Sequence, residues 1–191
     1  ALTHSARHLV YLAAATLDLS DAARASLLTP IVKAWVSDIA VEVSSLGVQI
    51  HGGTGYVDHS VISQIYRDAR IGPIFEGTNY IQSQDLLGRK VLRDSGVTLC
   101  SLLDDMQRSA EALPQEHTAL APLRNGVLDG CTRVRKTVQS LQSDAQRDPE
   151  LIGAVAYPFL QWLGVLIGGW SQCVAAANDA APKATLDVAV F

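Results

Sequence analysis

The stretch that decides the fold reads PIVKAWVSDIAVEVSSLGVQIHGG and occupies residues 30–53. Pro30 suits the first position of a helix, Thr29 can cap it, and the two terminal glycines are typical of a helix stop. Between these signals apolar residues recur at helical spacing: Ile31, Trp35, Ile39, Val43, Leu46 and Ile50. The spacing predicts one long helix with this stripe buried. The charged residues off the stripe are expected to face water; these are Lys33, Asp38 and Glu42.

Further helices are predicted on both sides of this stretch, and no strand pattern of useful length appears. Residues 52–58 are expected to form a glycine-rich loop, and Thr78 is expected to cap a helix that runs to about Arg93. The other predicted helices cover residues 2–17, 59–71, 97–112, 116–145 and 149–179. The chain is therefore predicted to be all-α, with one helical bundle over residues 1–94 and a smaller helical unit over residues 95–191.

Composition narrows the class of protein. The chain has 191 residues, 48% of them hydrophobic, which is enough for a packed core. Its net charge is −4 with no basic cluster, so no nucleic-acid partner is expected. Three well-separated cysteines give no disulfide framework and favour a reducing, intracellular compartment. Because a helix begins at once and the first residue is not methionine, we expect a part of a longer protein.

Residues 151–178 carry no charge, which is long enough for a membrane span. Gly164-x-x-x-Gly168 could even serve helix packing in lipid. No lysine or arginine cluster flanks the stretch, however, and Pro158 and Gln161 interrupt it. A buried helix is therefore the preferred interpretation, and no membrane span is expected.

The residues that could bind a ligand or take part in catalysis lie between Gln49 and Arg89. The glycines after Gln49-Ile50-His51 could let backbone N–H groups approach a phosphate, or could simply end the helix. No strand precedes them, so they are not a dinucleotide-binding fingerprint. The run Arg67-Asp68-Ala69-Arg70 ends a predicted helix, where a structural ion pair is preferred over a ligand contact.

Glu76 is the unusual residue of this region. It stands between Phe75 and Gly77, just before the helix start at Thr78. A carboxylate there can cap the helix, or it can act as a general base that its apolar neighbours desolvate and that Gly77 leaves accessible. His4 and His8 lie one helical turn apart, but no further ligand completes a metal site, so no metal is expected.

Together three segments resemble the C-terminal domain of acyl-CoA dehydrogenases. They are Gln49-Ile-His-Gly-Gly-Thr-Gly-Tyr, Tyr66-Arg-Asp-Ala-Arg-Ile and Phe75-Glu-Gly-Thr-Asn, in the family's order. The resemblance covers residues 1–94, and the remainder looks like the C-terminal helical extension of a larger bacterial-type branch. It implies an all-α fold in which a four-helix up-and-down bundle precedes a smaller helical extension.

The resemblance also implies roles for individual residues. Glu76 stands at the position of the family's catalytic base, and Gly77 would lie against the acyl thioester. The family's FAD, bound mainly by a neighbouring subunit, would be contacted by Gln49, Ile50, His51, Gly52 and Gly53. The FAD of the same subunit would be contacted by Thr78, Asn79 and Tyr80, the last standing where many members carry glutamine.

The implied reaction is α,β-dehydrogenation of an acyl-CoA thioester, a step of fatty acid β-oxidation. Glu76 would remove the α-proton, hydride would pass to FAD, and electron-transfer flavoprotein would accept the electrons. Two further domains of the family are missing here, so the fragment alone is expected to be inactive. The complete protein is expected to be a cytoplasmic homodimer or homotetramer.

Other functions stay open on the sequence alone. A non-enzymatic helical interaction module could keep the fold, although the intact Glu76-Gly77-Thr78 segment disfavours it. A membrane-associated protein would rest on residues 151–178. An acyl-CoA oxidase or nitroalkane oxidase would share the fold and pass electrons to oxygen; the latter is expected to use aspartate as base.

Overall fold

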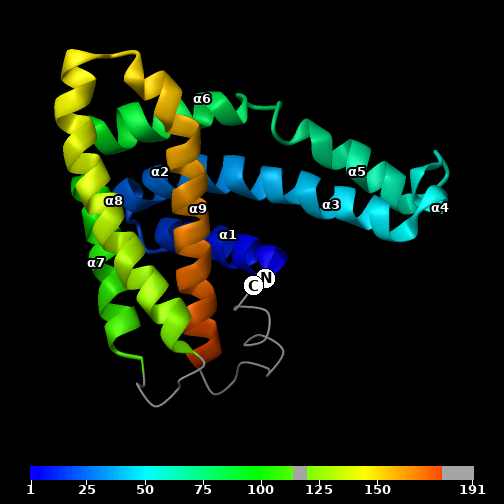
Figure 1. Cartoon of the computed structure of the whole chain (residues 1–191), viewed down its shortest axis with the longest axis horizontal. Coiled ribbons are helices and arrows are strands. Elements are labelled where there is room, and N and C mark those ends of the chain that lie inside the picture. Colours follow the sequence, from blue (N-terminus) through cyan, green and yellow to red (C-terminus); the bar gives the residue numbers. More distant parts are fainter. Residues whose placement is uncertain (114–119, 178–191) are drawn as a thin grey trace.

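The computed structural model describes residues 1–113 and 120–177, and within these residues it contains helices and no strand (Figure 1). This confirms the predicted all-α class. The predicted helix start at residue 116 and the end at residue 179 lie outside the described residues. The elements are α1 (Leu2–Asp18), α2 (Ala22–Ile31), η1 (Val32–Val36), α3 (Ser37–His51), α4 (Gly53–Tyr56), α5 (Val61–Ile71), α6 (Asn79–Gln84), η2 (Asp85–Leu92), α7 (Val97–Glu111), α8 (Ala121–Arg147) and α9 (Leu151–Ala177).

The long helix starts earlier than predicted. It begins at Ala22, where the Asp21 side chain caps it by accepting a hydrogen bond from the Arg24 N–H at 3.0 Å, and it continues through α2, η1 and α3. Thr29 and Pro30 therefore lie inside the helix, and the predicted start at Thr29 is wrong. The π-helical turn η1 begins two residues after Pro30, at Val32.

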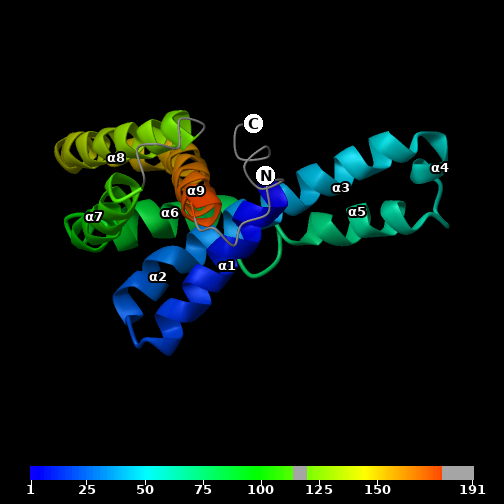
Figure 2. The ribbon, with the colours of Figure 1, turned by 90° about the horizontal axis from the view of Figure 1, so that it is seen from below.

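The distal half of α3 and the whole of α5 leave the body of the protein as a two-helix arm, with α4 at its tip (Figures 1 and 2). The predicted apolar stripe is accordingly buried only at its beginning, from Ile31 to Ile39. On the arm the exposed fractions rise from 38% at Val43 to 53% at Leu46 and 83% at Ile50. The prediction that the whole stripe is buried is wrong, because nothing in this chain covers the end of the arm.

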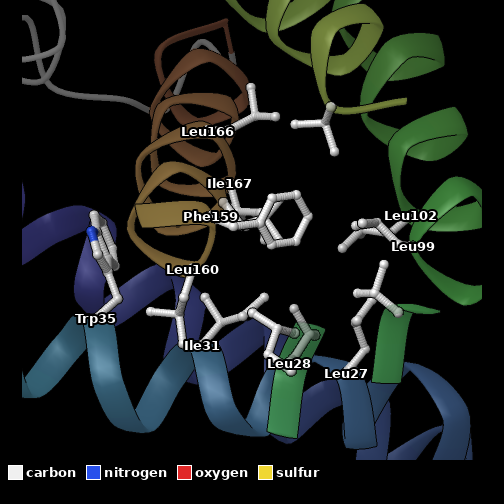
Figure 3. Packing of buried hydrophobic residues seen from close by; sticks show 14 of the residues in the cluster. Leu27, Leu28, Ile31, Trp35, Leu99, Leu102, Phe159, Leu160, Leu166 and Ile167 are labelled. Carbon is white, nitrogen blue, oxygen red and sulfur yellow. The ribbon is translucent and has the colours of Figure 1, made fainter. Parts of the chain in front are cut away.

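One hydrophobic core holds the body together, and α9 lies at its centre. Phe159, Leu160 and Ile167 of α9 face Leu28 of α2 and Leu102 of α7 (Figure 3). The buried cluster draws residues from both sides of residue 94. Within the described residues, α9 is the helix long and apolar enough to cross a membrane, yet its buried face belongs to this core. The predicted domain boundary at residue 94 stays a prediction.

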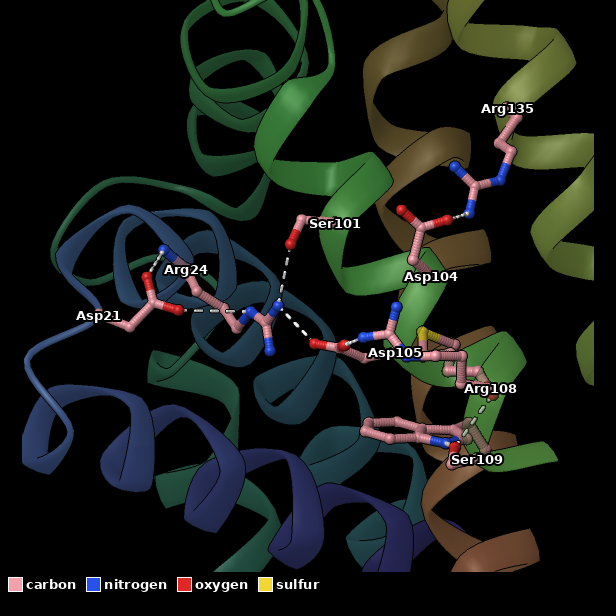
Figure 4. A network of polar contacts seen from close by, with 10 residues as sticks. Asp21, Arg24, Ser101, Asp104, Asp105, Arg108, Ser109 and Arg135 are labelled. Atoms are coloured by element: carbon pink, nitrogen blue, oxygen red, sulfur yellow. Dashed lines mark hydrogen bonds and ion pairs between the residues drawn. The ribbon is translucent and has the colours of Figure 1, made fainter. Parts of the chain in front are cut away.

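Polar contacts join the same helices at the edge of the core (Figure 4). Arg24 of α2 pairs with Asp105 of α7 at 2.6 Å and donates to Ser101 at 3.2 Å. On the other side of α7, Asp104 pairs with Arg135 of α8 at 2.6 Å. These ion pairs fix α7 between α2 and α8. The three cysteines are free, as expected for a protein without disulfides.

Candidate functional site

The loop between α5 and α6 presents Glu76 in an unusual backbone conformation. Glu76 has φ +55° and Gly77 has φ +84°, so two consecutive residues are left-handed. Glutamate rarely adopts this conformation, and strain of this kind persists where surrounding contacts hold it. Glu76 is exposed, as are its neighbours Ile74 and Phe75 at 53% and 62%. Contrary to expectation, the Glu76 carboxylate is therefore not desolvated by its apolar neighbours.

Three contacts from outside the two left-handed residues hold the loop. The Nζ of Lys33 donates to the Gly77 carbonyl at 2.6 Å, and the Nε2 of Gln82 donates to the Glu76 carbonyl at 3.2 Å. The Asn79 N–H donates to the Pro73 carbonyl at 3.0 Å and closes the loop. The carbonyls of Glu76 and of Gly77 are thus both anchored, while the Glu76 side chain remains exposed.

Lys33 is a functional candidate that the sequence did not reveal. It was expected to face water, but its ammonium group bridges the Gly77 carbonyl and the Asn79 side chain, the latter at 2.8 Å. Burial lowers the pKa of Lys33, while the carboxylates of Asp38 and Glu76 act in the opposite direction. Lys33 and the proposed base therefore share one electrostatic environment. The helical spacing alone carried no signal of this, because the partners lie more than forty residues away.

The residues after Gly77 take different positions. Thr78 is exposed and caps α6, its Oγ1 accepting from the Ile81 N–H at 3.3 Å, which confirms the predicted cap. Asn79 is buried, and its side chain is occupied by protein partners. The Tyr80 hydroxyl donates to the Gly153 carbonyl of α9 at 3.1 Å. A contact of Thr78, Asn79 or Tyr80 with a cofactor stays a prediction.

The glycines at the arm tip differ in the structural reason for glycine at each position. Gly52 ends α3 with φ +60°, which confirms the predicted helix stop. A Cβ on Gly55 would lie 2.6 Å from the His51 Cβ, so packing requires glycine there. A Cβ at Gly52 or Gly53 would meet no atom within 4 Å. Contacts within the chain therefore do not require a glycine at position 53. Its backbone is accessible from outside the chain.

The residues before these glycines also face outward. Gln49, Ile50 and His51 are exposed, and His51 Nδ1 donates to the Gly47 carbonyl at 2.9 Å, which leaves Nε2 free of that contact. Beside them a hollow of about 750 Å³ opens between α3, α4 and α5. Arg67 at its edge pairs with Asp58 at 3.4 Å. A structural rather than a ligand-binding role for the run from Arg67 to Arg70 stays a prediction.

The structure does not bring all the candidate residues together. The residues of the arm tip and the Glu76 loop lie at opposite ends of α5, and eleven helical residues span roughly 16 Å. One chain therefore presents two separate surfaces, one around Gly53 and one around Glu76. Among the described residues no cluster of three or more His, Cys, Asp or Glu side chains could hold a metal ion.

The comparisons with known proteins agree with this fold. The family model described as acyl-CoA dehydrogenase, C-terminal domain, matches residues 1–91. A 3-methylmercaptopropionyl-CoA dehydrogenase from Ruegeria pomeroyi is 37% identical over 180 residues, which are 89% of this chain and 31% of that protein. A broad-specificity linear acyl-CoA dehydrogenase from Mycobacterium tuberculosis is 31% identical over 150 residues, covering 75% of this chain and 24% of the relative.

Solved structures show the same fold beyond residue 91. ACDH-11 from Caenorhabditis elegans, crystallised with C11-CoA, superposes with a TM-score of 0.84 at 22% identity, over 98% of this chain and 33% of that one. An acyl-CoA dehydrogenase from Bacillus anthracis complexed with FAD gives a TM-score of 0.61 at 21% identity, over 84% of this chain and 28% of its own.

An all-α C-terminal domain followed by further helices is thus the class that the fold defines. The chain belongs to the acyl-CoA dehydrogenase family, with the family's C-terminal domain at residues 1–91. It spans about a third or less of the length of the relatives named above.

Proposed function

We propose that the complete protein is an FAD-dependent acyl-CoA dehydrogenase in which Glu76 takes the α-proton of an acyl-CoA thioester. The observation that carries the proposal is the Glu76 loop, where a left-handed glutamate is held by Lys33 and Gln82 with its carboxylate facing outward. A strained, anchored loop that presents one carboxylate is typical of a catalytic position. Family membership supplies the reaction class.

The chain's own residues would act on the proton. An α-proton beside a thioester is weakly acidic, so its removal requires a positioned base and donors for the developing enolate. Glu76 supplies the base, and Gly77 has no side chain to keep the thioester away from it. Because Glu76 is exposed here, the remainder of the protein would have to cover it and exclude water.

Bound FAD would accept the hydride from the β-carbon. The residues fit a cofactor that enters from outside the chain, because the space around Gly52 and Gly53 is open and Thr78 is exposed. The two separated surfaces also fit two different cofactors. Gln49, Ile50, His51, Gly52 and Gly53 would contact the FAD of a second subunit, and Thr78, Asn79 and Tyr80 that of their own.

The uncovered arm supports a homodimer or homotetramer. Many of the exposed large apolar side chains among the described residues lie on α3, α4, α5 and the loop that follows, for example Leu46, Ile50, Tyr56, Val61, Ile65 and Phe75. Apolar patches of this extent mark interaction surfaces. Electron-transfer flavoprotein is the proposed electron acceptor; one relative is a subunit of a caffeyl-CoA reductase-Etf complex. A cytoplasmic location is proposed with these partners.

The test uses the complete gene product. The purified protein should show a flavin spectrum, and one class of acyl-CoA thioester should bleach it in the absence of oxygen. Glu76→Gln should abolish this bleaching and keep the flavin bound, because glutamine cannot take the proton. Glu111→Gln, an exposed glutamate at the end of α7, is the matched control and should react like the unaltered protein. A colourless protein, or a flavin that no thioester reduces, would favour the non-enzymatic interaction module.

A further inference from the structure

A buried asparagine connects the Glu76 loop to the body of the protein. Asn79 is 5% exposed, and its Oδ1 accepts from Lys33 Nζ, the same group that holds the Gly77 carbonyl. Its Nδ2 donates to the Ala34 carbonyl at 3.0 Å and to Asp38 Oδ1 at 2.7 Å. Asp38 therefore holds the Asn79 side chain together with Ala34 and with Ser37, whose Oγ accepts from Asn79 Nδ2 at 2.9 Å. Lys33 joins this side chain to the Gly77 carbonyl.

Asp38 is held in turn by the last helix. Its second oxygen, Oδ2, accepts from the Tyr157 hydroxyl at 2.7 Å and from Gln161 Nε2 at 2.6 Å. Tyr157 and Gln161 stand one turn apart on α9, so both donors come from the same face of that helix. Hydrogen bonds to a carboxylate are the short and strong ones, and this carboxylate receives three of them.

This arrangement links the helical extension to the proposed base. Tyr157 and Gln161 lie 119 and 123 residues from Asp38 in sequence, beyond the matched family domain at residues 1–91. We infer that Asp38 is a positioning residue of the Glu76–Gly77 loop, and that α9 fixes its orientation through Tyr157 and Gln161. The inference rests on the proposed function of Glu76.

The geometry explains why these contacts matter to a catalytic loop. The left-handed conformations of Glu76 and Gly77 need support from outside, and Lys33 gives that support at the Gly77 carbonyl. Lys33 is directed by Asn79, and Asn79 by Asp38. A carboxylate that accepts from three donors cannot be replaced by an amide, because the amide nitrogen would meet a donor. Small displacements of a base are costly, about 100-fold in rate for 1 Å.

The experiment uses the complete, FAD-loaded protein and variants that change the network in steps. Asp38→Asn replaces one acceptor oxygen by an amide nitrogen and so breaks at least one of the three hydrogen bonds. Tyr157→Phe with Gln161→Leu removes the two donors of α9. Tyr157→Phe alone is the mildest change and guards against a failure to fold. Tyr11→Phe, an exposed tyrosine of α1, is the matched control. Two quantities are measured: the rate and substrate Kd of anaerobic flavin reduction, and hydrogen–deuterium exchange of the peptide around residues 72–80.

The expected result is a selective loss of rate. Asp38→Asn and the double variant should slow flavin reduction about 10- to 100-fold with little change in Kd, because the base is displaced and the binding surface is kept. Tyr157→Phe should give a smaller loss in the same direction. Exchange around residues 72–80 should be faster in each variant and unchanged in Tyr11→Phe.

Two outcomes would overturn the inference. Unchanged exchange in the double variant would show that α9 does not hold the loop. Faster exchange with an unchanged rate of flavin reduction would show that the network stabilises the loop but does not position Glu76 for catalysis. The proposed function fails separately, if no thioester reduces the flavin of the unaltered protein; the exchange measurement then still decides whether α9 fixes the loop.

Discussion

The indole of Trp35 lies directly against Gly164 of α9. Figure 3 shows the Trp35 ring beside this helix. A Cβ at Gly164 would lie 2.3 Å from Trp35 Cγ, and a Cβ at Gly168 would lie 2.7 Å from Trp35 Cη2. Both distances are shorter than atoms tolerate. The spacing Gly164-x-x-x-Gly168 could serve helix packing in lipid. In this chain the two glycines instead make room for the Trp35 ring.

Replacing Gly164 should destabilise the protein. In an exposed helix interior, Gly→Ala stabilises by about 0.8–1.0 kcal/mol. At Gly164 the new methyl group would displace the buried Trp35 ring, and overpacking of this kind costs about 1–3 kcal/mol. We expect Gly164→Ala to lower the free energy of unfolding, measured by denaturant titration of the complete protein.

Gly126→Ala provides the control for this measurement. Gly126 lies inside α8, and a Cβ there would meet no atom within 4 Å. This change should raise stability by about 0.5–1 kcal/mol, the ordinary gain in a helix. Equal effects of the two substitutions would mean that the contact between Trp35 and α9 does not exist in solution.

The ion pair between Arg24 and Asp105 should couple α2 to α7 more strongly than a surface pair does. Its side chains are 20% and 32% exposed, against 69% and 59% for Arg133 and Asp129 within α8. Double-mutant cycles should give about 0.5–1 kcal/mol for the first pair and about 0.3 kcal/mol for the second. Added salt should weaken the second pair more. Indistinguishable coupling energies would argue that Arg24 does not join the two helices.

Tyr157 should titrate far above an ordinary tyrosine. Burial and the hydrogen bond to Asp38 raise its pKa from 10 to about 12. Because the folded pKa lies above the unfolded one, this group contributes stability below about pH 10 and loses it as the pH rises toward 12. Phenolate absorbance followed to about pH 11 should therefore be the same in the unaltered protein and in Tyr157→Phe. A smaller change in Tyr157→Phe would contradict the contact with Asp38.

Local signals allowed correct prediction of helix ends, because caps act over a few residues. The Thr78 cap and the Gly52 stop were found this way, and both are confirmed. The start at Pro30 was predicted wrongly for a related reason. Pro30 is a good local start signal, but Asp21 already caps the helix upstream, and tertiary packing around the buried Pro30 keeps it within the helix.

The candidate site was predictable only in part. Glu76 stood out because its segment resembles a known family, whereas Lys33 and Asp38 were expected to face water. Their roles come from Asn79 and Tyr157, which lie far away in sequence and close in space. Periodicity assigns a residue to a face of its own helix, but it cannot say which helix covers that face. The exposed Leu46 and Ile50 mark the opposite error, an apolar face that this chain leaves uncovered.

The left-handed backbone of Glu76 should make its substitutions unequal in stability. Asparagine tolerates this conformation better than longer side chains do, and a left-handed residue costs about 1–2 kcal/mol. We expect Glu76→Asn to be more stable than Glu76→Gln by about 0.5–1 kcal/mol, with both variants inactive in flavin reduction. Glu42, an exposed residue within α3, provides the reversed control: there Asn should be less stable than Gln, because it is the poorer helix former. The same order of stability at both positions would mean that Glu76 is not left-handed in solution.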